Sequence, residues 1–176
     1  MTKLEKGCVQ VYTGNGKGKS TAAFGLALRA AGRGLRVKII QFMKTASDYG
    51  EQVAFQQWLP QIECCAYGSG QWVKKGQGSP VDYAQAAAAM LVAKEALDGD
   101  YDLVILDEIN NACFFQLLEP QAVVDLLVQR QPWVEVVLTG RNAPEEILAM
   151  ADLVTEMQEV KHPYYQGVSA RPGIEY

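Results

Sequence analysis

The chain has 176 residues, of which 49% are apolar, and a formal net charge of −4. This length and apolar content suit a single domain with a buried core, which we expect to span residues 1–176. The acidic balance argues against nucleic acid as a partner. The N-terminus lacks the apolar core of a signal peptide and no later apolar run reaches bilayer length, which predicts a soluble, cytoplasmic protein without membrane association.

Strand-like and helix-like segments alternate along the chain. The first strand is expected over residues 8–13, and an alanine-containing helix is expected over 19–33. The later strands are expected over 35–42, 62–67, 102–108, 134–140 and 152–160, and the later helices over 50–59, 81–97, 120–129 and 144–150. This alternation is typical of an α/β fold, in which a mostly parallel sheet of about six strands has helices on both faces.

The segment "YTGNGKGKST", residues 12–21, joins the first strand to the first helix. Free backbone N–H groups and the helix dipole make such a junction a site for anions. Gly18, Lys19 and Ser20 match the end of the P-loop pattern G-x-x-x-x-G-K-[ST], although Thr13 takes the place of its first glycine. A flexible surface turn would not explain this position between strand and helix. The sequence therefore predicts a phosphate site.

A second motif lies in "DLVILDE", an apolar strand that ends in Asp107 and Glu108. Taken alone, such an ending is more often a solvated turn or a helix cap. Beside a P-loop it is the usual arrangement for holding magnesium, and it supports the phosphate interpretation.

The chain resembles the ATP:corrinoid adenosyltransferases of the P-loop type in four stretches: "YTGNGKGKSTAAFGLALRAAGRG", "VILDEIN", "VVLTGRNAPEEILAMADLVTEM" and "VKHPYYQGVSARPGIEY". The resemblance covers nearly the whole chain and includes the pattern "TGNGKGK", with Thr13 in place of glycine. It implies the RecA-like fold of P-loop NTPases and a role in cobalamin biosynthesis.

The resemblance also implies a reaction. In this family the Co(I) centre of a reduced corrinoid attacks the ribose 5′ carbon of ATP, forms an adenosyl–cobalt bond and expels triphosphate. The P-loop then binds a leaving group, with Mg²⁺ or Mn²⁺ adding positive charge. The implied partners are ATP, a corrinoid, an electron-donating flavoprotein or ferredoxin, and a second copy of the chain in a homodimer.

Residue roles follow from the same resemblance. The residues expected to bind the triphosphate are Asn15, Gly16, Lys17, Gly18, Lys19, Ser20 and Thr21. Ser20 and Glu108 are the expected metal contacts, while Asp107 would act on the metal directly or through water, since neighbouring strand residues point to opposite faces. Lys19, Glu108 and Arg141 are the expected catalytic groups. Arg141 follows the strand over 134–140, and Arg29 in the first helix also matches the family.

For the corrinoid, the loop over residues 68–80 contributes Trp72, which matches a family aromatic that lies against the corrin ring. A packing role for this tryptophan remains the alternative. Gly70 stands where related enzymes carry another aromatic. The tail over 161–176 contains His162, which we expect to line the pocket rather than to bind cobalt.

The four cysteines lack a C-x-x-C pair, which argues against a structural zinc site. They are Cys8, Cys64, Cys65 and Cys113. Those in strand-like runs are expected to be small buried hydrophobes.

Two other functions stay open at this point. A small-molecule kinase would use the same P-loop to transfer the γ-phosphate and release ADP. A non-catalytic ATP-dependent binding or regulatory module would capture a protein partner without turnover.

Overall fold

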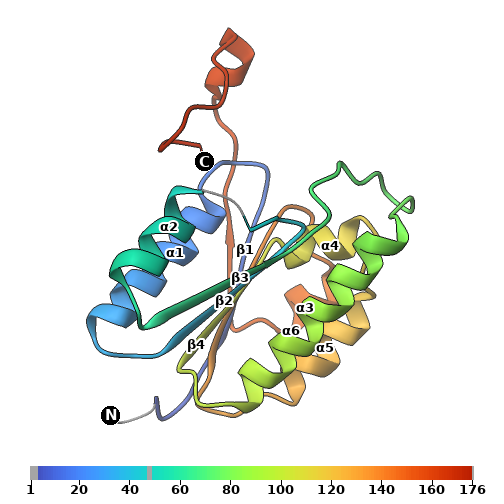
Figure 1. Ribbon diagram of the computed structural model, residues 1–176. Coiled ribbons are helices and arrows are strands. Elements are labelled where there is room, and N and C mark those ends of the chain that lie inside the picture. The colour runs from blue at the N-terminus through green and yellow to red at the C-terminus, as the bar shows by residue number, and fades with distance from the viewer. Residues whose placement is uncertain (1–3, 47–48, 176) are drawn as a thin grey trace.

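The computed structural model describes residues 4–46 and 49–175. Its centre is a six-stranded sheet in the order β3-β2-β4-β5-β1-β6, with every recorded strand pair parallel (Figure 1). The strands are β1 (Val9–Thr13), β2 (Val37–Phe42), β3 (Ile62–Tyr67), β4 (Leu103–Asp107), β5 (Glu135–Thr139) and β6 (Leu153–Glu156). The prediction of a parallel sheet of about six strands is therefore confirmed.

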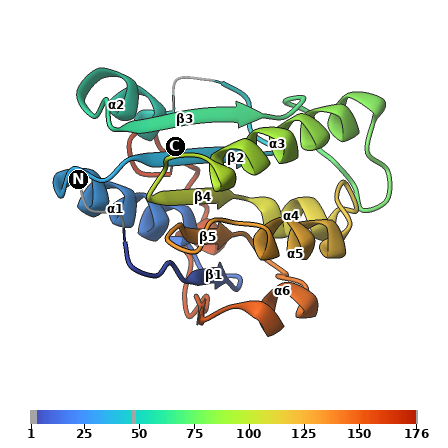
Figure 2. The same ribbon diagram turned by 90° about the horizontal axis from the view of Figure 1, so that it is seen from below.

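Helices cover both faces of the sheet (Figure 2). On one face lie α1 (Lys19–Gly32) and α2 (Gly50–Trp58), and on the other α3 (Pro80–Asp98), α4 (Ile109–Phe114), α5 (Pro120–Val128) and α6 (Glu145–Met150). Each face has its own apolar cluster. The central strand β4 is buried along its whole length, as expected of a strand covered on both faces. No helix in the described residues is both long and apolar enough to cross a bilayer.

The alanine-rich helix α3 shows why these residues form these elements. Ser79 and Asp82 form a capping box at its start, and Pro80 occupies its first turn, where the missing N–H costs nothing. Its small side chains at Ala89 and Ala93 are fully buried, which lets the helix lie close to the sheet. The expected helix over 81–97 agrees with this element within one residue at each end.

One helix was not predicted. The short α4 follows β4 after Glu108, which adopts a left-handed conformation with φ of 64°. Three apolar residues of α4 itself are buried: Ile109, Ala112 and Cys113. Its six residues span less than two turns, too short for a recognisable apolar period.

The prediction that the cysteines in strand-like runs are buried was wrong for all three of them. Only Cys113 is buried, whereas Cys8, Cys64 and Cys65 are half-buried. Cys64 and Cys65 lie in the edge strand β3, which has a neighbouring strand on one side only. Burial raises the pKa of the Cys64 and Cys113 thiols to about 12, so both stay protonated at neutral pH.

Because the strands are parallel, their carboxyl ends meet at one edge of the sheet. The loop before α1, the segment after β2, Glu108 and Arg141 all leave the sheet there. After β6 the chain projects beyond the same edge, forms a short 3-10 turn (η1, Pro163–Gln166) and bends back towards the body of the molecule (Figure 1). This edge is where open α/β sheets bind ligands.

Candidate active site

A cavity of about 760 Å³ opens at the carboxyl edge of the sheet. Five parts of the chain line it: the loop before α1 with the start of that helix, the segment after β2, the junction of β4 and α4, Arg141, and the tail. Its lining includes six predicted phosphate-binding residues, Gly16, Lys17, Gly18, Lys19, Ser20 and Thr21.

The P-loop is held in shape by the segment that follows β6. Gly16 N donates to Met157 O at 2.6 Å, and Met157 N donates to Thr13 O at 2.9 Å. Gly14 has φ of 91°, and a Cβ atom there would lie 2.5 Å from Met157 O. A Cβ atom on Gly16 would lie 2.7 Å from Gln158 O. These two glycines are required because another backbone approaches the loop so closely.

Thr13 stands at the end of β1, where the general P-loop pattern has glycine. Its hydroxyl accepts a hydrogen bond from Ala143 N at 3.3 Å, so it links the P-loop to the connection between β5 and α6. The threonine at this position therefore makes a hydrogen bond that a glycine could not make.

Lys19 lies across the P-loop. Its ammonium donates to Gly14 O and Gly16 O, both at 2.8 Å. Burial lowers the pKa of Lys19, and the charge of Arg141 lowers it further. The charge of Glu108 acts in the opposite direction and raises this pKa. The predicted catalytic trio of Lys19, Glu108 and Arg141 thus shares one electrostatic environment.

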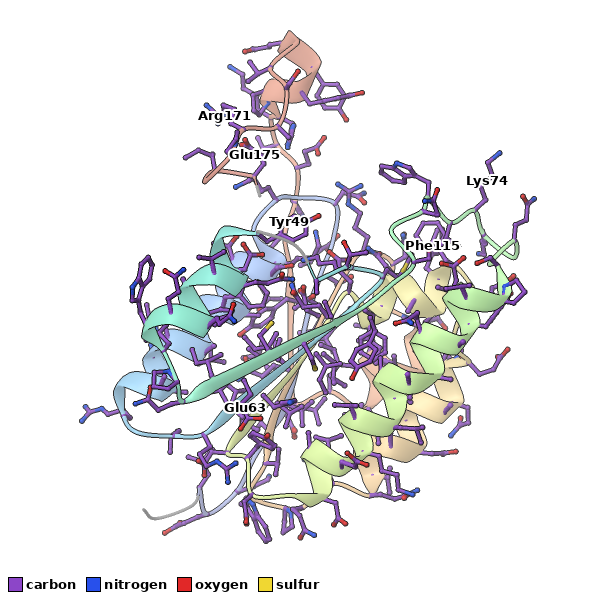
Figure 3. All side chains as sticks on the ribbon, in the orientation of Figure 1. Tyr49, Glu63, Lys74, Phe115, Arg171 and Glu175 are labelled. Carbon is purple, nitrogen blue, oxygen red and sulfur yellow. The ribbon has the colours of Figure 1, made fainter. Side chains whose placement is uncertain are left out.

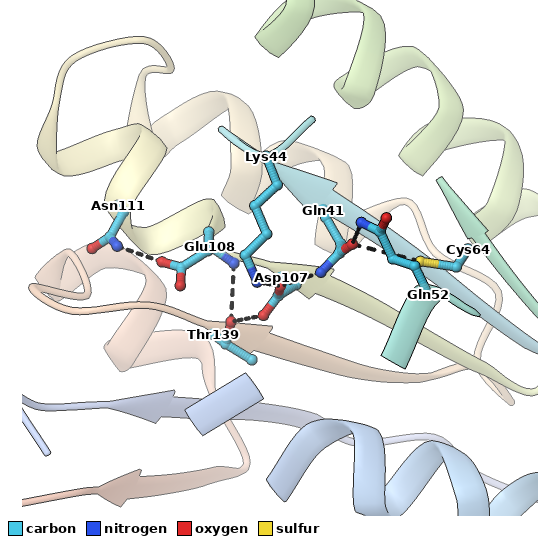
Figure 4. A network of polar contacts seen from close by, with 8 residues as sticks. All are labelled: Gln41, Lys44, Gln52, Cys64, Asp107, Glu108, Asn111 and Thr139. Carbon is cyan, nitrogen blue, oxygen red and sulfur yellow. Dashed lines mark hydrogen bonds and ion pairs between the residues drawn. The ribbon is translucent and has the colours of Figure 1, made fainter. Parts of the chain in front are cut away.

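Asp107 is fully buried and does not line the cavity. Its carboxylate accepts from Thr139 Oγ1 at 2.7 Å, from Gln41 Nε2 at 3.0 Å and from Lys44 Nζ at 2.8 Å (Figure 4). A hydrogen bond with the Ser20 hydroxyl also lowers its pKa. Burial alone would raise the pKa of Asp107, but the charge of Lys44 and these donors hold it below its usual range. The residue is an ionised anchor beneath the cavity.

Glu108 is the carboxylate that reaches the cavity. Its backbone N–H donates to Thr139 Oγ1 at 2.9 Å, and its carboxylate accepts from Asn111 Nδ2. Burial raises the pKa of Glu108 and the charge of Asp107 raises it further, while Lys44 and Lys19 act in the opposite direction. The left-handed backbone, unusual for glutamate, turns its side chain away from that of Asp107.

The oxygen atoms present suit a magnesium-type cation. Glu108 lines the cavity with Ser20, and the described residues hold no cluster of three His, Cys, Asp or Glu side chains. Mg²⁺ commonly binds through one or two carboxylates plus substrate phosphates and water, so a fuller protein cage is not needed. The pKa of Glu108 is raised, and a cation bound beside its carboxylate would favour the ionised form.

Arg141 follows Gly140 after β5 and lines the cavity. Its guanidinium donates to Asn15 O at 3.3 Å, which places Asn15 beside the cavity through its backbone. Gly140 has φ of 130°, and a Cβ atom there would lie 2.9 Å from Asn111 N. The turn that aims Arg141 therefore depends on a close approach to α4.

The tail closes one side of the cavity with His162, Ile174 and Glu175. Lys17 Nζ donates to Ile174 O at 3.2 Å. His162 Nδ1 accepts from the backbone N–H of Tyr164 at 3.2 Å, so its ring caps the turn η1. Figure 3 shows Arg171 and Glu175 on the tail, beyond the edge of the sheet where Tyr49 lies. The expectation that His162 lines the pocket agrees with this position.

Besides Asn15 and Asp107, two predicted residues lie outside the cavity lining, Arg29 and Trp72. Arg29 is exposed on α1, ten residues after Lys19, which corresponds to about 15 Å along the helix axis. Trp72 is fully exposed, at 101%, so the alternative of a packing tryptophan is wrong. The structure does not bring either side chain to the phosphate-binding residues.

The lining residues that sequence reasoning missed include Lys44, Tyr49, Glu51 and Asn111. Lys44 comes two residues after β2, at the same edge that drew attention to Arg141. The rule that ligands bind at the carboxyl ends of parallel strands could have found it.

The fold and this site define a class, the nucleotide-binding α/β proteins with a P-loop and a RecA-like sheet. Among solved structures, a KaiC-like protein from Pyrococcus horikoshii superposes with a TM-score of 0.53 and 17% identity, covering 90% of this chain and 76% of that one. At this identity the similarity supports the fold alone.

The chain belongs to the family of ATP:corrinoid adenosyltransferases described as BtuR/CobO/CobP, whose sequence model matches residues 5–176. A corrinoid adenosyltransferase of Pseudomonas aeruginosa is 39% identical, with 98% of this chain and 85% of the relative covered. A corrinoid adenosyltransferase of Escherichia coli K12 is 38% identical, with 98% of this chain and 87% of the relative covered. The family resemblance and the fold predicted from the sequence are both confirmed.

Proposed function

We propose that the protein transfers the 5′-deoxyadenosyl group of ATP to the Co(I) centre of a corrinoid. The cobalt–carbon bond forms with the electron pair of Co(I), while the bond from the ribose 5′ carbon to the phosphate oxygen breaks. Triphosphate leaves with the electron pair of the broken carbon–oxygen bond. The observation that carries this proposal is the family match over residues 5–176.

The cavity groups have the chemistry that a triphosphate leaving group needs. Backbone N–H groups at the start of α1, together with Lys19 and Arg141, would bind the phosphate oxygens and stabilise the charge that develops on them. A general base is not required because Co(I) is itself the nucleophile. This agrees with His162, whose Nδ1 accepts a backbone hydrogen bond instead.

Ser20 and Glu108 would hold the magnesium or manganese ion. The cation would supply positive charge to the triphosphate. Asp107 would orient the Ser20 hydroxyl through their hydrogen bond rather than bind the cation, because it is fully buried and already accepts from several donors.

The corrinoid is assigned to the face of the cavity near the loop over residues 68–80. Trp72 would lie against the corrin ring, where its full exposure leaves it free to stack. Gly70, where related enzymes have an aromatic residue, leaves Trp72 as the aromatic contact that we assign. We further propose an electron-donating flavoprotein or ferredoxin as the source of Co(I), a homodimeric assembly and a cytoplasmic location.

The test is an anaerobic assay of the full chain with MgATP and a chemically reduced Co(I) corrinoid, followed by its visible spectrum and by analysis of the nucleotide products. We expect the adenosyl–cobalt spectrum with triphosphate in equal amount. Lys19→Ala should lower turnover by about 10²–10³-fold at saturating MgATP. Lys94→Ala, an exposed lysine on α3, is the matched control and should leave it unchanged.

The other functions would give different products. Formation of ADP with an unchanged corrinoid spectrum would indicate a kinase. Intact ATP together with nucleotide-dependent capture of a protein would indicate a binding or regulatory module. Either result would contradict the proposed reaction.

A further inference from the structure

A third ammonium, that of Lys44, lines the phosphate cavity outside the P-loop motif. We propose that Lys44 is a further substrate-binding residue, whose ammonium is positioned by Asp107 and binds the triphosphate chain from the side opposite Arg141. This inference rests on the proposed function, because it assigns a contact for the same leaving group.

The sheet order places Lys44 where such a contact requires it. β4, which ends at Asp107 and is followed by Glu108, lies between β2 and β5. Lys44 follows β2 and Arg141 follows β5, so the two cations flank the carboxylates from opposite sides. Met43 has a left-handed φ of 57°, which turns the chain sharply before Lys44. In Figure 4 the Lys44 side chain extends to Asp107.

The Lys44 ammonium has more N–H donors than recorded hydrogen-bond acceptors. An ammonium group has three N–H donors. Among the described residues, its one recorded hydrogen-bond acceptor is Asp107 Oδ2 at 2.8 Å. The Lys44 side chain is 21% exposed while that of Asp107 is 0% exposed, so the lysine, unlike its partner, faces the cavity. The remaining donors are therefore available to phosphate oxygens.

Asp107 has other donors besides Lys44. Thr139 Oγ1 donates to Oδ1, Gln41 Nε2 donates to Oδ2, and the Ser20 hydroxyl also bonds the carboxylate. A neutral side chain at position 44 would still leave these hydrogen bonds in place. The ion pair fixes where the ammonium lies, as expected of a residue that must be preorganised for a ligand.

Basic and acidic side chains nearly balance in the cavity, so each basic side chain matters for the affinity for triphosphate. Four basic and three acidic side chains line it: Lys17, Lys19, Lys44 and Arg141 against Glu51, Glu108 and Glu175. Lys17 already donates to Ile174 O on the tail. A triphosphate carries several negative charges, so removal of one inward-facing cation should weaken its binding measurably.

The test measures binding of inorganic tripolyphosphate to the full chain by calorimetry in EDTA, which removes divalent cations. We expect Lys44→Met to weaken binding by about tenfold to a hundredfold, the effect of losing a charged hydrogen bond. Lys38→Met is the matched control, because Lys38 lies on β2, the strand that Lys44 follows, but pairs with Glu63 and does not line the cavity. It should bind like the wild type. Equal affinity for all three proteins would overturn the proposal.

A second pair of variants covers the case in which Lys44→Met does not fold. Asp107→Asn keeps the ammonium and removes its partner, and Asp107→Asn with Lys44→Met removes both charges. We expect the double variant to bind tripolyphosphate at least tenfold more weakly than Asp107→Asn alone. Equal affinity would mean that Lys44 acts only through Asp107, and would overturn the proposal.

Failure of the proposed function would look different. A wild-type protein that binds tripolyphosphate through Lys44 but forms no adenosyl–cobalt product would contradict the reaction and leave this contact standing. A wild-type protein that forms the product, with Lys44→Met unchanged in affinity, would overturn only this contact. A wild-type protein that neither binds tripolyphosphate nor forms the product would overturn both.

Discussion

At the residue scale, the pair Asp107 and Glu108 shows how position decides chemistry. The two carboxylates are adjacent in sequence, yet the pKa of Asp107 is lowered and that of Glu108 is raised. Asp107 lies among the donors of Lys44, Ser20 and Thr139, whereas Glu108 is half-buried beside the negative charge of Asp107. The first is suited to orient its neighbours and the second to receive a cation.

Asp107→Asn should destabilise the protein in a pH-dependent way. A carboxyl group with a lowered folded-state pKa contributes stability above its unfolded pKa of about 3.9, and this is lost as the pH falls through the folded value. We expect the free energy of unfolding to drop by about 3 kcal/mol at pH 7, because Lys44 would lose its buried partner. Urea denaturation from pH 7 down to pH 3 should show that the difference in unfolding free energy between the wild type and Asp107→Asn becomes smaller as the pH falls. A difference independent of pH would contradict this assignment.

Glu108→Gln should have the opposite pH dependence. A glutamate with a raised folded-state pKa favours folding below its unfolded value of about 4.3, and this advantage is lost as the pH rises through the folded value. The amide avoids the cost of a buried charge, so we expect a melting temperature at pH 8 equal to or above that of the wild type. MgATP affinity should nevertheless fall by about 10–100-fold. A lower melting temperature at pH 8 would argue against a destabilising charge at this position.

At the scale of elements, the shape of the P-loop depends on its contacts with the segment that follows β6. Gly14→Ala would force a positive φ on alanine and place its Cβ 2.5 Å from Met157 O. We expect a loss of about 2 kcal/mol in stability and weaker tripolyphosphate binding. Gly25→Ala is the control, because a Cβ there meets nothing within 4 Å and the site lies inside α1. That substitution should add about 1 kcal/mol of stability.

The loop over residues 68–80 offers a test of the corrinoid face. Trp72→Ala should weaken corrinoid binding by about tenfold if its ring stacks on the corrin. Trp58→Ala is the matched control, because Trp58 is also exposed, at 71%, but lies on α2. Binding can be followed by the corrinoid spectrum, with MgATP affinity unchanged in both variants. Equal corrinoid affinities would remove Trp72 from the substrate site.

Elements with a strong local signal were predictable from the sequence. Apolar runs predicted the strands, and a run of strong helix formers rich in alanine predicted α3. The left-handed turns at Met43 and Glu108 were not predictable, because no glycine marks them. Lys44 was missed for the same reason, since its place in the site depends on the turn at Met43 and on Asp107, 63 residues later in the chain.

At the scale of the whole molecule, nucleotide binding should stabilise the entire fold, because the cavity joins the segments that follow β1, β2, β4, β5 and β6. At a MgATP concentration of 100 times its dissociation constant, the gain is about 2.7 kcal/mol. For a chain of this size we expect the melting temperature to rise by about 5–10 °C in differential scanning fluorimetry. The Lys19→Ala variant should show a much smaller rise, and an equal rise would place the nucleotide elsewhere.

The place of β1 in the sheet bears on how the protein is made. β1 is the first strand of the chain, yet it pairs only with β5 and β6. Cys8 N, just before β1, bonds Glu135 Oε2 at a separation of 127 residues. A ribosome makes β1 before either of its neighbours in the sheet, so the P-loop has no supporting strand until β5 and β6 have been made. ATP can therefore bind only chains that already contain these two strands, and a chain that stops before them cannot be rescued by its own substrate.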